Sequence, residues 1–131
     1  MLEHDYIQQM IKQFTLAVAG ALREVILDQQ IDRSLGAEEA VADLMNLSAD
    51  AAMSLEPASF VTMMQLTGIG DEIAGYVAYT LDRLADAYED AGDDDLATQR
   101  RAQAEAVAGA FGWDLCNVPA ELADLDEELY G

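Results

Sequence analysis

The stretch from Asp71 to Gly112 constrains the fold most, because it reads as two helical segments joined at a glycine. In its first half, large residues recur at spacings of four and three, which places them on one helix face: Ile73, Val77, Leu81, Leu84 and Tyr88. Gly92 follows where a left-handed residue often ends a helix. In the second half, small residues share one face with an aromatic: Ala97, Ala104, Ala108 and Phe111. The stretch therefore predicts an antiparallel helix pair.

Acidic residues stand at the start of both predicted helices of this pair. Asp71 is expected to cap the first helix, because a short side-chain oxygen can accept one of its unpaired backbone N–H groups. Asp93, Asp94 and Asp95 offer a cap and a favourable charge to the second helix, whose start carries partial positive charge. The two helix starts are therefore predicted to lie close to these positions.

The charge of the chain limits its partners. Aspartate and glutamate number 26 against 6 lysines and arginines, for a formal net charge of −20. Such a charge repels nucleic-acid phosphates and anionic membranes and favours cationic partners. We expect no nucleic-acid or membrane binding, and a protein or peptide partner with a basic face. A mimic of nucleic acid and a merely solubilising acidic surface remain alternatives.

Length and the pattern of the N-terminus indicate a single cytoplasmic domain over residues 1–131. The opening MLEHDY carries acid where a secretory signal carries base. The most apolar run, from Phe14 to Leu27, is interrupted by Arg23 and Glu24, so we expect no membrane span. The single cysteine, Cys116, cannot form an internal disulfide and is expected to be buried.

The remaining patterns predict an all-α architecture of about five to seven helices around a long N-terminal helix. That first helix is expected from about Leu2 to Gln30, and a second from about Ala37 to Leu55. The segment Asn46–Asp50 either kinks or splits the second helix. Pro57 is expected to start a short third helix, and Pro119 a last one with a leucine stripe.

The helix pair at residues 71–112 resembles the tetratricopeptide repeat (TPR). Its large and small residues match the repeat pattern in order: Leu81, Leu84, Ala85, Tyr88, Gly92, Ala97 and Ala104. It departs from the pattern at Arg101, usually an aromatic, and at Gly109, where the repeat usually ends in proline. The opening MLEHDYIQQMIKQF also resembles a family of small uncharacterised bacterial proteins with a TPR-like fold. These resemblances imply a TPR-like helical array, with an irregular bundle as the alternative, and they supply no site.

The sequence shows no catalytic arrangement, so we expect no enzyme and no cofactor. His4 is the single histidine and has no cysteine or histidine at metal-ligand spacing. Four aspartates at the turn of the helix pair could gather a divalent ion, but they lack the spacing of a calcium-binding loop: Asp90, Asp93, Asp94 and Asp95. A solvated turn is the alternative interpretation.

A partner-binding surface is predicted on the first helix of the pair. Tyr76 and Tyr79 lie beside its apolar face, and partly exposed aromatics often anchor partners. Arg83, Asp86 and Asp90 follow on the same helix and complete the predicted surface. Packing of the tyrosines against the second or third helix is the alternative.

The sequence thus favours a non-enzymatic, acidic protein-interaction module, and two other functions remain open. One is a small-ligand or metal-binding protein with a pocket among Met63, Met64, Tyr76 and Trp113. The other is a structural homo-oligomer built on the first helix, whose apolar residues recur at the spacing of a helix packed on helices.

Overall fold

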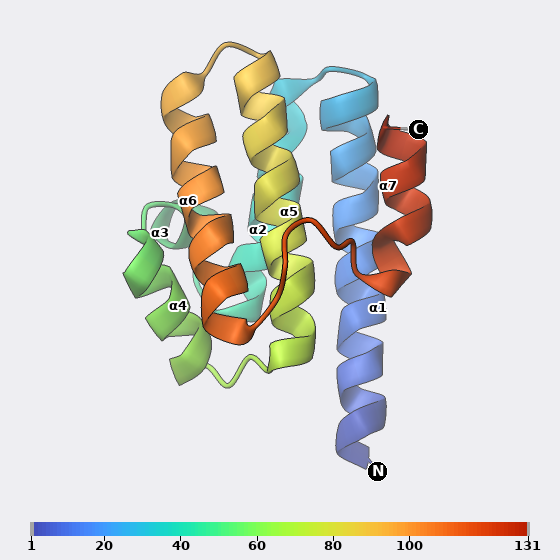
Figure 1. Cartoon of the computed structure of the whole chain (residues 1–131), viewed down its shortest axis with the longest axis vertical. Coiled ribbons are helices and arrows are strands. Elements are labelled where there is room, and N and C mark those ends of the chain that lie inside the picture. The colour runs from blue at the N-terminus through green and yellow to red at the C-terminus, as the bar shows by residue number, and fades with distance from the viewer. Residues whose placement is uncertain (1, 131) are drawn as a thin grey trace.

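The computed structural model describes residues 2–130, with side chains from Tyr6 onward, and this range contains helices and no strand (Figure 1). The expected all-α class with a long N-terminal helix is confirmed. His4 lies outside the described side chains. The α-helices are α1 (Leu2–Leu22), α2 (Ser34–Leu44), α3 (Ala49–Met53), α4 (Pro57–Leu66), α5 (Asp71–Asp90), α6 (Asp94–Phe111) and α7 (Ala123–Tyr130).

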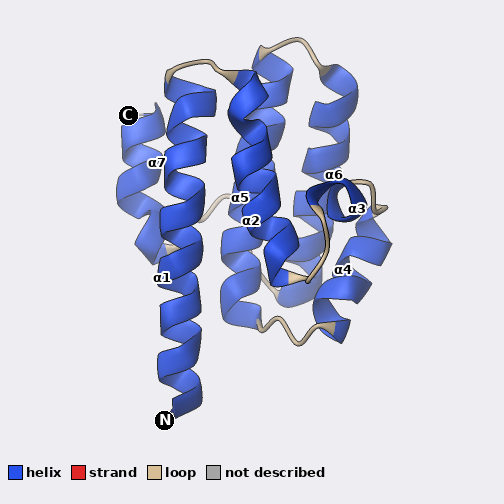
Figure 2. Cartoon of the chain, turned by 180° about the vertical axis from the view of Figure 1, so that it is seen from behind, coloured by secondary structure: helices blue, strands red, loops and turns tan. Residues whose placement is uncertain are grey.

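The predicted antiparallel pair is formed by α5 and α6, which stand side by side. Helix α5 runs through the middle of the molecule, and α6 lies on the side away from α1 (Figures 1 and 2). Gly92 has a φ of 85°, the left-handed conformation expected at this turn. Asp93 caps α6, because its carboxylate accepts the Leu96 N–H at 3.3 Å. The expected cap at Asp71 is wrong, since Gly70 occupies that position. Asp71 lies in the first turn, where its charge still favours the helix.

The first helix ends earlier than the expected Gln30. After Leu22 the chain continues as a π-helical turn, Arg23–Leu27, in which the Asp28 N–H donates to the Arg23 carbonyl at 3.2 Å. Gln29 then adopts a left-handed φ of 54°, which ends the helical path. The predicted end was wrong because apolar spacing does not show where the backbone hydrogen bonds change from the four-residue spacing of an α-helix to the five-residue spacing of a π-helix.

The expected second helix, Ala37–Leu55, is two helices, so the segment Asn46–Asp50 splits it. Asn46 has a left-handed φ of 57°, and Ser48 caps α3 by accepting the Ala51 N–H at 3.2 Å. Pro57 occupies the first position of α4, as predicted.

The C-terminal segment, residues 113–130, returns across α5 and ends with α7 beside α1 (Figures 1 and 2). Gly112 ends α6 with a φ of 76°. Pro119 precedes a 3-10 turn, Ala120–Leu122, that leads into α7. The expected leucine stripe is confirmed, since Leu122, Leu125 and Leu129 are buried.

A buried polar network joins α2, α5 and α6 to the end of α3. The Arg100 Nε donates to a Glu38 carboxylate oxygen at 2.9 Å, and the Tyr88 hydroxyl donates to the same oxygen at 2.9 Å. Arg100 and Gln103 also donate to the Met53 carbonyl at 3.2 and 3.1 Å. That carbonyl belongs to the last turn of α3, where carbonyls lack partners within the helix. The network is therefore part of the core and fixes the short helix α3.

Candidate binding surfaces

The structure buries Tyr76 and Tyr79 beneath the C-terminal segment, so the expected exposure of both rings is wrong. The Tyr76 hydroxyl donates to the carboxylate of Glu121, and the Tyr79 hydroxyl donates to that of Asp126 at 2.8 Å. A segment more than 40 positions along the chain covers them, which helix periodicity in α5 could not indicate.

Arg83 is held between two aromatic rings. Its guanidinium carbon lies 4.8 Å from the centre of the Tyr79 ring and 4.9 Å from that of Tyr130. The same side chain forms ion pairs with Asp86 at 3.1 Å and Asp126 at 3.3 Å. Arg83 therefore fastens α7 to α5, and its charge is already balanced within the molecule.

Asp86 and Asp90, the remaining residues of the predicted surface, differ in their surroundings. Asp86 is half-buried and accepts from Arg101 of α6 at 2.9 Å as well as from Arg83. Asp90 is exposed at the end of α5, beside a small hollow of about 230 Å³. The structure thus joins Tyr79, Arg83 and Asp86 in one network and leaves Asp90 outside it.

Burial and carboxylate neighbours change the acidity of three phenols at this junction. Desolvation, together with hydrogen bonding to carboxylates, raises the pKa of Tyr76, Tyr79 and Tyr130 well above the usual range of a phenol. Tyr76 and Tyr79 belong to α5 and Tyr130 to the C-terminal segment, so all three lie at the contact between the two. Deprotonation of these hydroxyls is therefore expected to weaken the attachment of the segment to α5.

The arginines of the chain form ion pairs within the molecule. Each arginine lies within 4 Å of a carboxylate, and the pairs include Arg23–Glu128, Arg33–Glu24, Arg83–Asp86, Arg100–Glu38 and Arg101–Asp82. Most of the 26 acidic residues have no such counterpart, because the chain has six lysines and arginines in all. The surface is consequently much more acidic than basic.

The largest described cleft lies where the N-terminal half of α1 passes the end of α2 and the turn between α4 and α5. Its volume is about 640 Å³. Apolar side chains from three elements form its walls: Tyr6, Ile7, Met10, Leu44, Ile69 and Ile73. Tyr6 is 63 % exposed, and Ile7, Met10 and Leu44 are half-buried, whereas Ile69 and Ile73 are buried. The apolar surface open to solvent therefore comes mainly from α1 and Leu44.

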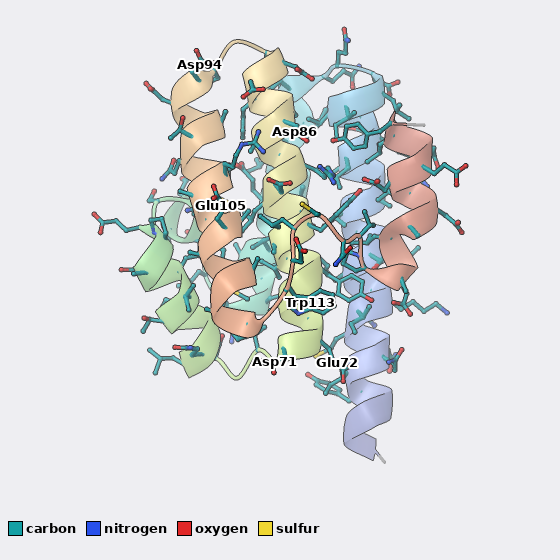
Figure 3. The ribbon with its side chains drawn as sticks, viewed as in Figure 1. Asp71, Glu72, Asp86, Asp94, Glu105 and Trp113 are labelled. Carbon is teal, nitrogen blue, oxygen red and sulfur yellow. The ribbon has the colours of Figure 1, made fainter. Side chains whose placement is uncertain are left out.

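Three carboxylates surround this cleft. Asp43 comes from α2, and all three residues are exposed. Asp71 and Glu72 come from the first turn of α5 (Figure 3). Among the residues whose side chains the structure describes, the lining of the cleft contains no lysine, arginine or histidine. Sequence reasoning missed this grouping, because 28 positions separate Asp43 from Asp71 and nothing in either segment indicates the other. The cleft therefore combines apolar walls with an unbalanced negative charge.

The expected pocket among Met63, Met64, Tyr76 and Trp113 is wrong, because these side chains fill space. Met64 is fully buried, and the Trp113 ring packs edge to face on Tyr76 with ring centres 6.4 Å apart. Trp113 also covers Gly75 so closely that a Cβ there would lie 2.4 Å from its ring. Trp113 is partly buried and packs against the core.

Two further sequence expectations concern cysteine and metal. Cys116 is exposed, so the expected burial is wrong. Its segment crosses the outside of α5 because Gly112 ends α6 before the cysteine is reached. Within the part of the chain whose side chains are described, no group of three histidine, cysteine or acidic residues is placed to hold a metal ion.

Comparison with known proteins found no match among protein-family models, curated proteins or solved structures. The likeness to TPR proteins and to a bacterial family stays a prediction from the sequence. None of the described helices is long and apolar enough to cross a bilayer.

Proposed function

We propose that this chain is a non-enzymatic binding module for a basic, amphipathic segment of a partner protein. The cleft between α1, α2 and α5 is the binding site in this proposal. The observation that carries it is the pairing of open apolar walls with three exposed carboxylates and no cationic side chain in the lining. Apolar residues of the partner would contact Tyr6, Met10 and Leu44, while its lysines or arginines would face Asp43, Asp71 and Glu72.

This site replaces the predicted one on α5 as the favoured place for a partner. Tyr76, Tyr79, Arg83 and Asp86 are engaged by the C-terminal segment, whereas the residues of the cleft are exposed at its rim. A cationic partner gains both charge complementarity and apolar burial in the cleft, and the charge component weakens as salt is added.

The test uses a synthetic helical peptide of leucine and lysine, labelled for fluorescence anisotropy. Binding that falls with added NaCl is expected, and two control peptides should bind far more weakly: one with glutamate for lysine, one with serine for leucine. The triple variant D43N/D71N/E72Q should lower affinity between about threefold and about a hundredfold, since each of the three exposed charge pairs contributes roughly 0.2–1 kcal/mol.

A matched control keeps the same change in net charge. D94N/D95N/E105Q also removes two first-turn acids and one further exposed acid, but on α6. Asp94 and Glu105 lie on α6, away from Asp71 and Glu72 at the start of α5 (Figure 3). Equal loss of affinity in both triple variants would show attraction to the overall charge and contradict a site in the cleft.

A second candidate function is the binding of a small apolar amine in the same cleft. Its volume of about 640 Å³ lies within the range of roughly 300–1,000 Å³ usual for small-ligand pockets. Thermal-shift measurements with a series of aliphatic and aromatic amines test it. A rise in the unfolding temperature that D43N/D71N/E72Q abolishes, without peptide binding, would favour this candidate.

A further inference from the structure

The outer face of α1 differs in charge from the rest of the molecule. No acidic residue occurs from Tyr6 to Arg23, although the chain contains 26. Five uncharged residues at helical spacing are exposed there, and we call them the neutral face of α1: Gln9, Gln13, Leu16, Ala17 and Gly20. Leu16 is 69 % exposed, and the N-terminal turns of α1 project beyond the other helices (Figures 1 and 2).

Next to Leu16, the same helix carries a hollow of about 240 Å³ lined by Tyr6, Gln9, Met10 and Gln13. These four residues have the spacing i, i+3, i+4 and i+7. Four residues at this spacing form the hole that receives one side chain when two helices pack together. The neutral face thus holds both an exposed apolar side chain and a hole of the kind that receives one.

We infer that the neutral face of α1 pairs with the same face of a second copy of this chain. The two α1 helices run antiparallel across a two-fold axis at Gln13, so that each interface residue meets its counterpart in reverse order. Leu16 of each copy then enters the hollow of the other. The Gln13 side chains meet at the axis, where an amide can both donate to and accept from its symmetry mate.

Gly20 fits this register. Gly20 lies four residues beyond Leu16, at the level of Tyr6 of the second copy, and its lack of a side chain leaves room for the aromatic ring. Within one copy, no atom lies within 4 Å of a Cβ built at Gly20, and glycine weakens a helix relative to alanine. The interior of a single copy therefore gives no reason for a glycine at this position.

Charge favours a second copy as the occupant. Two chains of formal charge −20 repel each other wherever their carboxylates approach within a screening length of about 8–10 Å. The neutral face itself carries no carboxylate, and the acidic group beside it, Glu121, shares a hollow with Lys12. Two copies can therefore meet there with few carboxylates opposed. A basic partner, in contrast, gains more at the acidic surfaces.

This dimer does not rest on the proposed function, although Tyr6 and Met10 line both the cleft and the hollow of the neutral face, and it has the opposite salt dependence. Added NaCl screens the repulsion between two acidic copies, so dimerisation should strengthen with salt, whereas binding of a basic peptide should weaken. Failure of one therefore leaves the other standing.

Sedimentation velocity at low, intermediate and high NaCl tests the inference on the full chain. We expect a dimer that strengthens with salt and is weakened more than about tenfold by Leu16→Glu. The control is Leu66→Glu on α4, which places the same charge at a leucine that is 75 % exposed. A chain that stays monomeric up to millimolar concentration, or a dimer that Leu66→Glu disrupts and Leu16→Glu does not, would overturn the inference.

A cross-link tests the two-fold axis. In a Cys116→Ser background, Gln13→Cys should form an intermolecular disulfide under mild oxidation, because the two residues meet at the axis. Gln8→Cys is the control, since Gln8 is exposed on the same helix but outside the neutral face. Equal cross-linking at both positions, or cross-linking at Gln8 alone, would contradict the antiparallel register.

Discussion

Two arginine networks of the helix pair differ in what surrounds them. Arg100 and Glu38 have side chains that are 5 % and 10 % exposed, and their partners belong to α2, α5 and the end of α3. Arg83 and Asp126 are 17 % and 25 % exposed, and their partners include the C-terminal helix. The first network is enclosed by core helices. The second network joins residues 113–130 to the surface of the pair α5–α6.

The difference shows that ion pairs of similar geometry can have different roles. Removing one member of an enclosed pair leaves a charge without water or a partner, which is costly. Removing one member of the outer network lets water reach the remaining groups. We therefore expect the first network to determine whether the molecule folds, and the second to determine whether residues 113–130 stay attached.

The largest effect is expected at the enclosed network. Arg100→Ala leaves Glu38 buried without its cation, so the free energy of unfolding should fall by about 3–5 kcal/mol. Urea denaturation followed by circular dichroism measures this. The double variant Glu38→Leu/Arg100→Met should recover part of the loss, because no unpaired charge remains. A loss from Arg100→Ala no larger than about 1 kcal/mol, as for an exposed ion pair, would remove the distinction between the two networks.

The next effect concerns the contact between α5 and the start of the C-terminal segment. Gly75→Ala places a methyl group where the Trp113 ring lies, at 2.4 Å, so the ring must move outward. We expect a loss of about 1–3 kcal/mol and a red shift of tryptophan fluorescence, which reports on this residue alone because Trp113 is the single tryptophan.

Gly109→Ala on α6 is the matched control for Gly75→Ala. Gly109 is exposed, and no atom lies within 4 Å of a Cβ built there. Alanine should therefore stabilise the helix by roughly 0.5–1 kcal/mol and leave the fluorescence unchanged. If both variants shifted the fluorescence alike, the close packing of Trp113 on Gly75 would not be the cause.

The outer network should show a smaller global effect and a clear local one. Arg83→Ala removes two ring contacts worth roughly 0.5–1 kcal/mol each, so we expect a loss of about 1–2 kcal/mol. Amide hydrogen exchange should rise mainly in α7. Arg33→Ala is the comparison, because the Arg33–Glu24 pair is exposed and its atoms lie 3.8 Å apart. Uniformly faster exchange across α5, α6 and α7 would mean that the C-terminal segment is not a separate unit.

The two networks also mark the limit of inference from the sequence. The pair α5–α6 was predictable, because apolar spacing and Gly92 are local signals that agree. Pro57 likewise located the start of α4, whereas Pro119 precedes the 3-10 turn Ala120–Leu122 and α7 itself begins at Ala123. The split at Asn46 was left open, since asparagine adopts a left-handed φ only in some contexts.

The candidate site was much less accessible to sequence reasoning. The tyrosines of α5 were expected at the surface, because their cover comes from a segment more than 40 residues later. Asp43 and Asp71 share one cleft through the packing of α1, α2 and α5, and neither stands in a motif. The acidic composition predicted a basic partner, but tertiary packing determines where carboxylates lie next to exposed apolar side chains.

The smallest expected effect is a loss of stability of the outer network at alkaline pH. Below the ordinary phenol pKa of about 10, Tyr79 is protonated in both the folded and the unfolded chain. Because folding raises its pKa, the unfolded chain releases this proton first as the pH rises, and the free energy of unfolding then falls. We expect α7 to exchange amide hydrogens faster above this pH, while α2 and α6 stay protected. Tyr79→Phe should cost about 0.5–1.5 kcal/mol at neutral pH and reduce the alkaline response. If Tyr79→Phe left the alkaline response unchanged, the response would belong to Tyr76 and Tyr130. If α6 lost protection at the same pH as α7, the contrast between the two networks would disappear.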